Sequence, residues 1–200
     1  QSWANVYDLV YQEESTGKSI DLTKVINDRG LTEVEMVEIA EDFFLSLGFK
    51  PLEDTFWERS LFVKPVDRNV VCHASAWDIN PKTQDLRIKM CIEKNAEDFV
   101  TIHHELGHIF YYQAYAHQPS VFQSGANDGF HEAVGDLLSL SITPNYLEKI
   151  GFVSKEEADS AKENSIAFLM KQALDGVVPT PCTLMLDKCR MAVFNVDLEE

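Results

Sequence analysis

The chain has 200 residues, 45% of them hydrophobic, which is enough to bury one sizeable core. Its 33 acidic side chains outnumber 17 Lys and Arg and give a formal net charge of −16, which argues against binding to nucleic acid or to an acidic membrane, because basic patches hold such partners. No apolar run is long enough to span a membrane, and the chain lacks an initiator methionine and a signal-peptide pattern, so we expect residues 1–200 to be a central fragment of one domain.

The first predicted elements are helices. Residues 1–11 repeat apolar side chains at helical spacing, so we expect an amphipathic helix at the start of the chain. A shorter helix is predicted over residues 21–29, because Asp21 is a suitable N-cap and Gly30 suits the position just past a helix end.

A capping box opens a third predicted helix. Thr32 and Glu35 have the spacing at which each side chain bonds the backbone N–H of the other. Beyond Gly48, which should end the helix, residues 52–67 lack a clear period and predict an irregular segment with about one helical turn. The residues expected on the buried face of the third helix are Val34, Val37, Phe44 and Leu47.

Two β-type runs, residues 70–79 and 85–93, flank a turn-forming stretch and predict one β-hairpin. Cys72 and Cys91 fall at the open ends of its strands, where cross-strand neighbours come within reach of a disulfide bond. With only four cysteines in the chain, four free thiols are the alternative. By strand alternation His73 faces away from Cys72, and a merely packed histidine fits that position as well as a binding residue does.

The next predicted helix, capped by Asn95, carries the strongest chemical signal of the chain. Its residues His104, Glu105 and His108 have the spacing H-E-x-x-H, which puts two imidazoles one turn apart, where both can reach one zinc ion. Glu105 lies about a quarter turn round the helix, where its carboxylate can take a proton from a water that the metal activates. An amphipathic helix can also carry this motif by accident, with packed histidines and a solvated glutamate.

A further carboxylate follows 24 residues after His108. Glu132 stands on a predicted helix that starts at Asn127 or Asp128, and Asp136 follows one turn later. Hydrolytic zinc sites use three protein ligands and one open position, and His, His and Glu is a common set. Asp136 would then accept a hydrogen bond from the far nitrogen of a ligand histidine. The alternative is a solvated helix face, which the largely apolar character of this helix disfavours.

Three more helices are predicted towards the end of the chain. Residues 143–151 form a compact one, from an N-cap threonine to a closing glycine. Ser154 and Glu157 form a second capping box, at the start of a long helix that we expect to reach about Asp175. The last helix is expected over residues 181–194.

Two cysteines share one face of this last helix. Cys182 and Cys189 are roughly 10 Å apart by the helical rise, too far for a bond between them, so we expect both to stay reduced. The sequence contains no internal repeat, low-complexity tract or N-glycosylation sequon.

The sequence resembles the peptidyl-dipeptidase A family of zinc metallopeptidases, which includes angiotensin-converting enzyme and its invertebrate relatives. The similar blocks occur in the family's order: VVCHASAWDI, HHELGHIFYY and GANDGFHEAVGDLLSLS. The similarity runs nearly end to end, from QSWANVYDLV to DKCRMAVF. It implies a mainly α fold, the central part of an all-helical zinc-metallopeptidase domain with one small β-hairpin.

The resemblance also implies roles for individual residues. His104, His108 and Glu132 would hold one zinc ion, and Glu105 would activate the water and then protonate the leaving amine. Other implied features are substrate binding by Gln1 and His73, pairing of the peptide with the Ala74 backbone, and a disulfide between Cys72 and Cys91.

For the intact enzyme, the resemblance implies release of C-terminal dipeptides from oligopeptides, in a secreted protein or an ectodomain whose membrane anchor lies outside this chain. A non-catalytic peptide- or protein-binding module on the same scaffold is one alternative, and the intact ligand set argues against it. A thermolysin-like endopeptidase is another, and the CHASAWD block and the long spacer before Glu132 argue against that. The oligomeric state is not indicated.

The chain also departs from the family. Pro179 and Cys182 stand where relatives have aromatic residues, so the preference for the substrate's final side chain is left open. The family's lid helices and its later segment do not occur in these residues; that segment carries the transition-state histidine and tyrosine, the carboxylate-binding lysine and the chloride ligands. We therefore expect the chain alone to hold zinc but to catalyse poorly.

Overall fold

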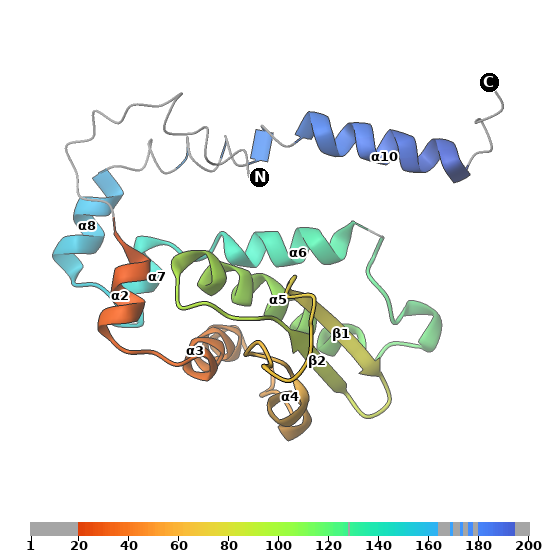
Figure 1. The fold of residues 1–200 in the computed structure, drawn as a ribbon, viewed down its shortest axis with the longest axis horizontal. Coiled ribbons are helices and arrows are strands. Elements are labelled where there is room, and N and C mark those ends of the chain that lie inside the picture. Colours follow the sequence, from red (N-terminus) through yellow and green to blue (C-terminus); the bar gives the residue numbers. More distant parts are fainter. Residues whose placement is uncertain are drawn as a thin grey trace. The chain divides into compact units, whose positions relative to one another are not determined.

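The protein is described by a computed structural model, which is mainly helical with one two-stranded antiparallel hairpin, as predicted (Figure 1). Its contacts divide the chain into two units, residues 21–153 and residues 1–20 with 154–200. The predicted first helix, with Gln1, lies outside the described residues. The described residues are 20–127, 129–163, 169, 173, 176–177 and 180–194.

The first unit contains the hairpin and most of the helices. No helix among the described residues is both long and apolar enough to cross a membrane. The helices of this unit are α2 (Leu22–Asp28), α3 (Glu33–Ser46), α4 (Asp54–Arg59), α5 (Ala96–Tyr115), η2 (Ser120–Phe122, a 3-10 helix), α6 (Phe130–Ser139) and α7 (Pro144–Lys149).

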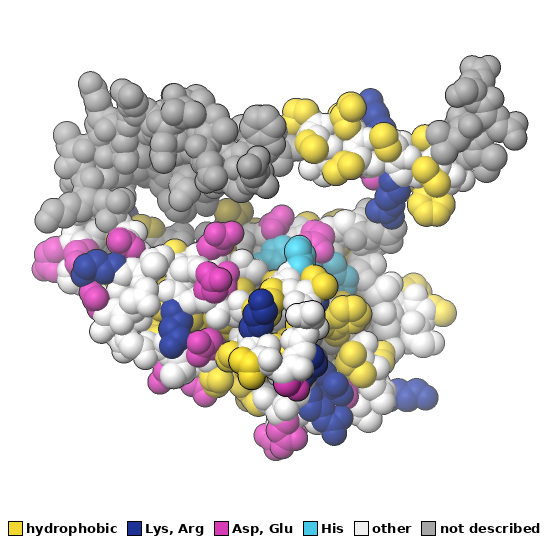
Figure 2. Space-filling view, viewed as in Figure 1, with side chains coloured by type: hydrophobic (Ala, Val, Ile, Leu, Met, Phe, Trp, Pro, Cys, Tyr) yellow, Lys and Arg dark blue, Asp and Glu magenta, His cyan; other side chains and the backbone are white. Residues whose placement is uncertain are grey.

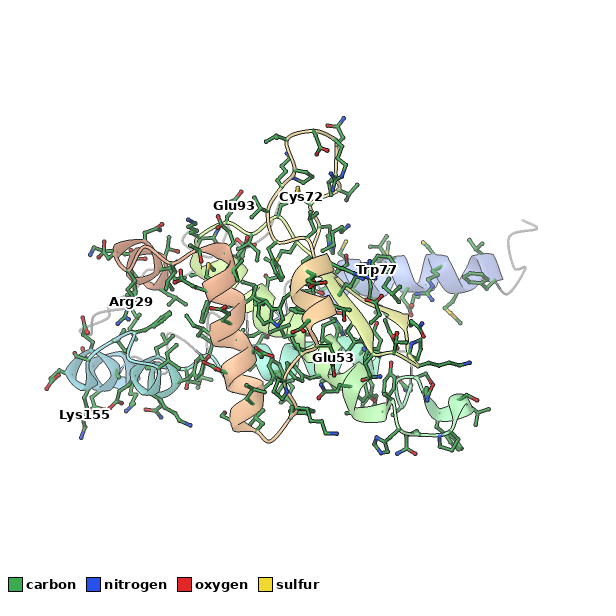
Figure 3. The ribbon with its side chains drawn as sticks, turned by 90° about the horizontal axis from the view of Figure 1, so that it is seen from below. Arg29, Glu53, Cys72, Trp77, Glu93 and Lys155 are labelled. Atoms are coloured by element: carbon green, nitrogen blue, oxygen red, sulfur yellow. A yellow bond between two sulfur atoms is a disulfide. The ribbon has the colours of Figure 1, made fainter. Side chains whose placement is uncertain are left out.

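The local signals at α2 and α3 act as predicted. Asp21 accepts a hydrogen bond from the Lys24 N–H, and Gly30 follows α2 with a φ of 66°, the left-handed conformation that glycine adopts without strain. At the start of α3, Thr32 and Glu35 form both bonds of the capping box. Arg29, labelled in Figure 3, donates to the Gly151 carbonyl beyond α7.

The buried face of α3 differs in part from the predicted one. Val37 and Phe44 are fully buried, but Val34 and Leu47 are 40% and 54% exposed. Val34 lies about a quarter turn from the buried stripe, and Leu47 is the C-cap residue, past the last residue that packs on the core. The stripe consists of Met36, Val37, Ala40 and Phe44.

The hairpin is shorter than the sequence predicted. β1 (Ser75–Asn80) pairs with β2 (Asp85–Lys89), and Ser75 lies opposite Lys89. On the other side of β2 the chain at Leu61 adds a bridge, with its N–H donating to the Ile88 carbonyl. Among the described residues no strand pairs with the outer edge of β1, so that edge keeps free backbone groups.

Helix α5 forms the centre of this unit. Its N-cap Asn95 accepts a hydrogen bond from the Asp98 N–H at 2.7 Å, as predicted. The helix packs on α3, on both strands and on α6, and the ring of Phe110 stacks on that of Phe44 at 4.3 Å. The apolar residues that form its buried side are Phe99, Ile102, Leu106, Ile109 and Phe110.

The start of α6 was predicted wrongly. The helix begins at Phe130 with Gly129 as its N-cap, not at Asn127 or Asp128. Asn127 accepts hydrogen bonds from the N–H groups of Gly129 and Phe130, so it forms a turn ahead of the helix, and Asp128 lies outside the described residues. The prediction for α7 is confirmed, because Thr143 caps it and Gly151 follows it with a φ of 75°.

The second unit contains α8 (Lys155–Glu163) and α10 (Thr180–Phe194). Ser154 and Glu157 make the predicted capping bonds at the start of α8. The predicted extension of this helix to Asp175 falls largely outside the described residues, as does Pro179.

Candidate metal centre

Helices α5 and α6 bring two histidines and one carboxylate to a common point. His104 and His108 lie one turn apart on α5, with their Nε2 atoms 3.1 Å from each other. Glu132, in the first turn of α6, places its carboxylate oxygens 3.2 Å from His104 Nε2 and 3.7 Å from His108 Nε2. Within the described part of the chain, these three residues form the group able to hold a metal ion, with ligand atoms all within 4.8 Å of one another.

These separations fit the coordination of one small cation. Zinc binds imidazole and carboxylate at about 2.0–2.1 Å in a tetrahedron, so its ligand atoms lie about 3.3 Å apart. The observed values of 3.1 to 3.7 Å lie around that spacing. Two imidazoles and one carboxylate are also the donor set of hydrolytic zinc sites, with a fourth position left open.

The two histidines differ in their surroundings. His108 is buried, and burial lowers the pKa of its imidazole, an effect that the charge of Glu132 opposes. A lowered pKa favours the neutral ring, which is the form that binds metals. The Glu132 side chain is 71% exposed, so α6 presents its carboxylate from the solvent side. Figure 2 shows histidines gathered next to acidic side chains on one face of the molecule.

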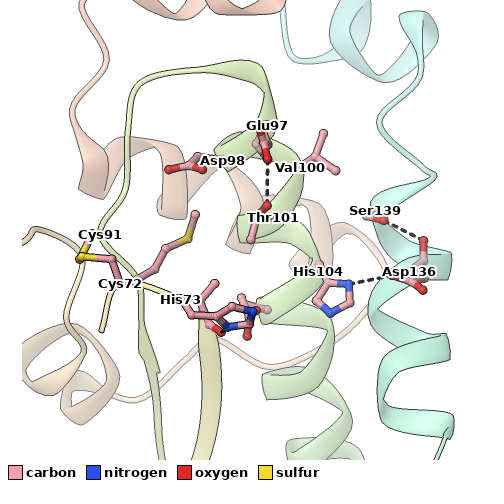
Figure 4. Close-up of a pocket in the computed structure, with 13 residues that line it drawn as sticks. Cys72, His73, Cys91, Glu97, Asp98, Val100, Thr101, His104, Asp136 and Ser139 are labelled. Atoms are coloured by element: carbon pink, nitrogen blue, oxygen red, sulfur yellow. Dashed lines mark hydrogen bonds and ion pairs between the residues drawn. A yellow bond between two sulfur atoms is a disulfide. The ribbon is translucent and has the colours of Figure 1, made fainter. Parts of the chain in front are cut away.

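Asp136 contacts the other nitrogen of His104. Its Oδ1 lies 3.0 Å from His104 Nδ1 (Figure 4), although its side chain is 73% exposed. The carboxylate accepts the Nδ1–H, which leaves the lone pair of His104 on Nε2, the nitrogen that faces Glu132.

Two glycines that sequence reasoning missed allow the close approach of the helices. A Cβ atom on Gly107 of α5 would lie 2.9 Å from the Gly135 Cα, and one on Gly135 would lie 2.8 Å from the His104 ring. Real Cβ atoms essentially never come so close to another atom. The available signal was a glycine in the middle of each predicted helix, where glycine is costly without a packing reason.

Glu105 lies beside the two histidines and is only 6% exposed. Its Oε2 atom is buried and has no hydrogen-bond partner among the described residues. Burial raises the pKa of this carboxyl, and the nearby charge of Glu132 raises it further, whereas His104 and His73 lower it. A buried, unpartnered oxygen with a raised pKa is typical of a group that exchanges a proton with a ligand.

A pocket of about 500 Å³ adjoins the centre and is lined by the first half of α5 and by the chain before β1 (Figure 4). Both His73 and Ala74 line it, together with Glu105. His73 and Cys72 lie before β1, which starts only at Ser75, and the Cys72 side chain is directed at Cys91 while the His73 ring lies on the side of α5 (Figure 4). The His73 ring is exposed and its Nδ1 lies 2.7 Å from the Ala74 carbonyl oxygen.

Cys72 and Cys91 are joined by a disulfide bond, as predicted, and their Cα atoms are 5.1 Å apart. The bond ties the chain before β1 to the chain after β2 and forms part of the pocket wall. Cys182 and Cys189 are free and exposed, which agrees with the prediction that they stay reduced.

The sequence analysis gave no role to His103, the residue before the motif. It is fully buried, with Nδ1 2.8 Å from the Phe99 carbonyl and Nε2 3.1 Å from the Tyr146 hydroxyl. Burial lowers the pKa of its imidazole to about 4. Nδ1 therefore donates to the carbonyl and Nε2 accepts from the hydroxyl, which makes His103 a neutral core residue that links α5 to α7.

Comparison with known proteins gives matches along the whole chain. The family model of the peptidase M2 group, described as angiotensin-converting enzyme, matches residues 1–200. Angiotensin-converting enzyme of Bos taurus is 46% identical over 198 residues, which cover 98% of this chain and 15% of that protein. The enzyme of Haematobia irritans exigua is 43% identical over 199 residues (98% and 32%), and the angiotensin-converting enzyme-related protein of Drosophila melanogaster is 41% identical over 203 (100% and 31%). The chain therefore spans about a third or less of the length of these relatives.

Proposed function

Because the chain belongs to the angiotensin-converting enzyme family of peptidases, we propose that it carries the metal-binding and proton-transfer part of a zinc peptidase that releases C-terminal dipeptides from oligopeptides. The proposal is carried by one observation, the convergence of donor atoms from His104, His108 and Glu132 beside the buried Glu105. Since the chain spans a minority of its relatives' length, the activity and the substrate are both part of the proposal.

Zinc would be held by the Nε2 atoms of His104 and His108 and by the Glu132 carboxylate, leaving one position open. When bound, zinc supplies a Lewis acid that lowers the pKa of a water molecule and polarises the peptide carbonyl. Asp136 holds the Nδ1–H of His104 and so directs the lone pair of Nε2 to the ion.

Glu105 would move the proton. Its Oε2 has no partner among the described residues and is free to take a proton from the attacking water. Burial raises the pKa of the carboxyl, which brings its affinity for a proton closer to what transfer near neutral pH requires. The same carboxyl then returns the proton to the leaving amine.

The peptide would lie along the chain that leads into β1. Ala74 lines the pocket next to Glu105, and the outer edge of β1 offers free backbone groups to an extended peptide. His73, exposed at the same wall, would contact the substrate. Gln1, which the family resemblance assigns to the substrate's terminal carboxylate, lies outside the described residues.

We propose an extracellular setting, either secreted or as an anchored ectodomain. The support is the disulfide between Cys72 and Cys91, because such bonds persist in oxidising compartments.

Metal analysis of the purified chain tests the ligand set. We expect near-stoichiometric zinc in the wild type, little in the His104→Ala/His108→Ala double variant, and weaker binding after Glu132→Gln than after Glu105→Gln. Equal zinc in the wild type and the double variant would refute the ligand assignment.

Turnover of a blocked tripeptide tests the chemistry, with the zinc-loaded chain and the full-length protein assayed side by side. Glu105→Gln in the full-length protein should keep its zinc and lose at least about a hundredfold in rate, the contribution typical of a positioned general base. The chain alone should turn over about a hundred- to thousandfold more slowly, the usual effect of losing one oxyanion donor. Retained turnover in Glu105→Gln would remove Glu105 from the mechanism.

A further inference from the structure

The second histidine of the centre, His108, is hydrogen-bonded on its far side by a residue of α6 to which neither the sequence analysis nor the proposed function gives a role. His108 Nδ1 lies 3.3 Å from Nδ1 of His131, and His131 Nε2 lies 2.9 Å from the Tyr115 hydroxyl. The three groups form a continuous line from the candidate centre back to the end of α5. His104 has a carboxylate in the equivalent position, the side chain of Asp136.

Packing fixes the orientation of the His131 ring. Its centroid lies 4.8 Å from that of Tyr111, 4.6 Å from that of Tyr112 and 5.8 Å from that of Tyr115. A Cβ atom built on Gly125 would lie 3.2 Å from the ring, so the connection before α6 also approaches it closely. A ring held in this way keeps its nitrogens pointed at fixed partners.

Proton positions along this line follow from which nitrogen of His108 binds the ion. His108 faces His104 and Glu132 with Nε2, so a neutral ligand ring must carry its proton on Nδ1. That Nδ1–H points at His131 Nδ1, which must accept it and therefore carries its own proton on Nε2. The Tyr115 oxygen then accepts the Nε2–H.

His131 is badly placed to bind the ion directly. The nitrogen that faces the centre is its Nδ1, and that atom contacts Nδ1 of His108, on the side of the imidazole away from Glu132. Its other nitrogen is directed at Tyr115. Both nitrogens are thus engaged in orientation of neighbouring groups.

We propose that His131 is a positioning residue for the metal centre: it accepts the Nδ1–H of His108, with Tyr115 as its own acceptor, and thereby presents the Nε2 lone pair of His108 to the ion. This inference rests on the proposed function, since it takes His108 as a zinc ligand. In the proposed site α6 supplies one ligand, Glu132, and the groups that orient both ligand histidines, Asp136 for His104 and His131 for His108.

Two substitutions of His131 separate hydrogen bonding from packing. His131→Asn keeps an acceptor, because the Oδ1 of asparagine is attached at the same carbon as the histidine Nδ1, whereas His131→Leu keeps apolar bulk and removes the acceptor. Zinc affinity is measured by competition with a chromophoric chelator, and folding is checked by circular dichroism. We expect His131→Leu to lose about 10- to 100-fold in zinc affinity, the range typical of residues that orient metal ligands, and His131→Asn to stay within about threefold of wild type.

Tyr115→Phe provides a second comparison that leaves His131 in place. Its matched control is Tyr112→Phe, since both rings pack on His131 but only the Tyr115 hydroxyl bonds a nitrogen of His131. Nitrogen-15 NMR of the zinc-loaded chain should show a hydrogen-bonded proton on His108 Nδ1 in wild type and in His131→Asn. That signal should exchange rapidly with water in His131→Leu, and zinc affinity should fall in Tyr115→Phe and not in Tyr112→Phe.

The possible results distinguish a failure of the positioning role of His131 from a failure of the proposed function. A wild-type chain that binds no zinc overturns both. A different result is that wild type binds zinc and the two variants, His131→Leu and His131→Asn, have the same zinc affinity as each other, whether high or low. The positioning role of His131 then fails, while the assignment of the zinc ligands stands. Should His131→Leu not fold, equal zinc affinities of Tyr115→Phe and Tyr112→Phe overturn the inference.

Discussion

Gly107 of α5 and Gly135 of α6 meet at the crossing of the two helices, so closely that a single Cβ atom on Gly107 would lie 2.9 Å from the backbone of Gly135. His104 packs against the same glycine, since a Cβ on Gly135 would lie 2.8 Å from its ring. The distance between the helices, and with it the distance from His104 to Glu132, therefore depends on the absence of side chains at this crossing.

We predict that Gly135→Ala destabilises the protein and weakens the metal centre. Alanine favours a helix over glycine by about 1 kcal/mol, but overpacking costs about 1–3 kcal/mol and here displaces a candidate ligand. Urea unfolding should show a net loss, and zinc affinity should fall. Gly176→Ala is the matched control, because that helical glycine has no neighbour within 4 Å of an added Cβ. This variant should show only the stabilisation that comes from the higher helix propensity of alanine. A stabilised Gly135→Ala with unchanged zinc affinity would contradict the packing argument.

A second prediction concerns Asp136. Asp136→Asn keeps the size of the side chain but replaces the carboxylate that accepts the His104 Nδ1–H, and should lower zinc affinity about 10- to 100-fold. Chelator competition at fixed pH measures it. Asp159→Asn removes one exposed carboxylate, which pairs with Lys162 and is not among the groups of the centre, and should leave the affinity unchanged. Equal effects of the two variants would reduce the role of Asp136 to that of a general negative charge.

The disulfide between Cys72 and Cys91 should stabilise the chain by restricting its unfolded state. For a sequence separation of 19 residues the loop-closure estimate is about 3 kcal/mol. Replacing both cysteines with serine should lower the free energy of unfolding by roughly that amount, whereas Cys182→Ser, at a free and exposed thiol, should change it little. Non-reducing peptide mapping should recover the linked pair, and alkylation of Cys72 and Cys91 without reductant would disprove it.

Stability of the metal-free chain should fall in mild acid because of His103. Its pKa is lowered by burial from about 6.5 in the unfolded chain to about 4, so between these values the unfolded state binds more protons. The contribution of neutral His103 to the free energy of unfolding is complete above pH 6.5 and is lost as the pH falls to 4. The whole contribution is about 3 kcal/mol, and about 2 kcal/mol of it is lost by pH 5. Urea titrations at pH 7.5 and 5.0 with chelator should show this loss in wild type relative to His103→Gln. Parallel pH profiles would show that His103 does not stay neutral when buried.

The fold was predictable wherever a short-range signal decides the structure. Capping residues such as Asp21, Thr32 and Asn95 satisfy backbone groups within a few residues, so the beginnings of α2, α3 and α5 follow from local chemistry. The start of α6 could not be predicted in the same way. Asn127 is a good cap by type, but its bonds close a turn, and Gly129 takes the cap position without any side chain.

The candidate centre was predictable to a similar extent. The spacing of His104 and His108 fixes their relation on one helix, and Glu132 and Asp136 were identified as carboxylates on a second helix. His131 was missed because its role depends on its contact with His108 of α5, and the spacing of residues in the sequence does not indicate that contact. The same holds for the glycine crossing, since a helical glycine shows a close approach only once its partner is known.

The connection between α5 and α6 is exposed around η2, where Val121 and Phe122 are 79% and 65% exposed. The proposed ligands and the groups that orient them all come from the two helices, whose register is set at their crossing. Insertions and sequence drift within η2 itself are therefore expected to leave the centre unchanged over evolutionary time. For protein design, residues 96–139 are the segment to graft, because a new scaffold that supplies the apolar partners of α5 would inherit the centre, with the turn at η2 open to redesign.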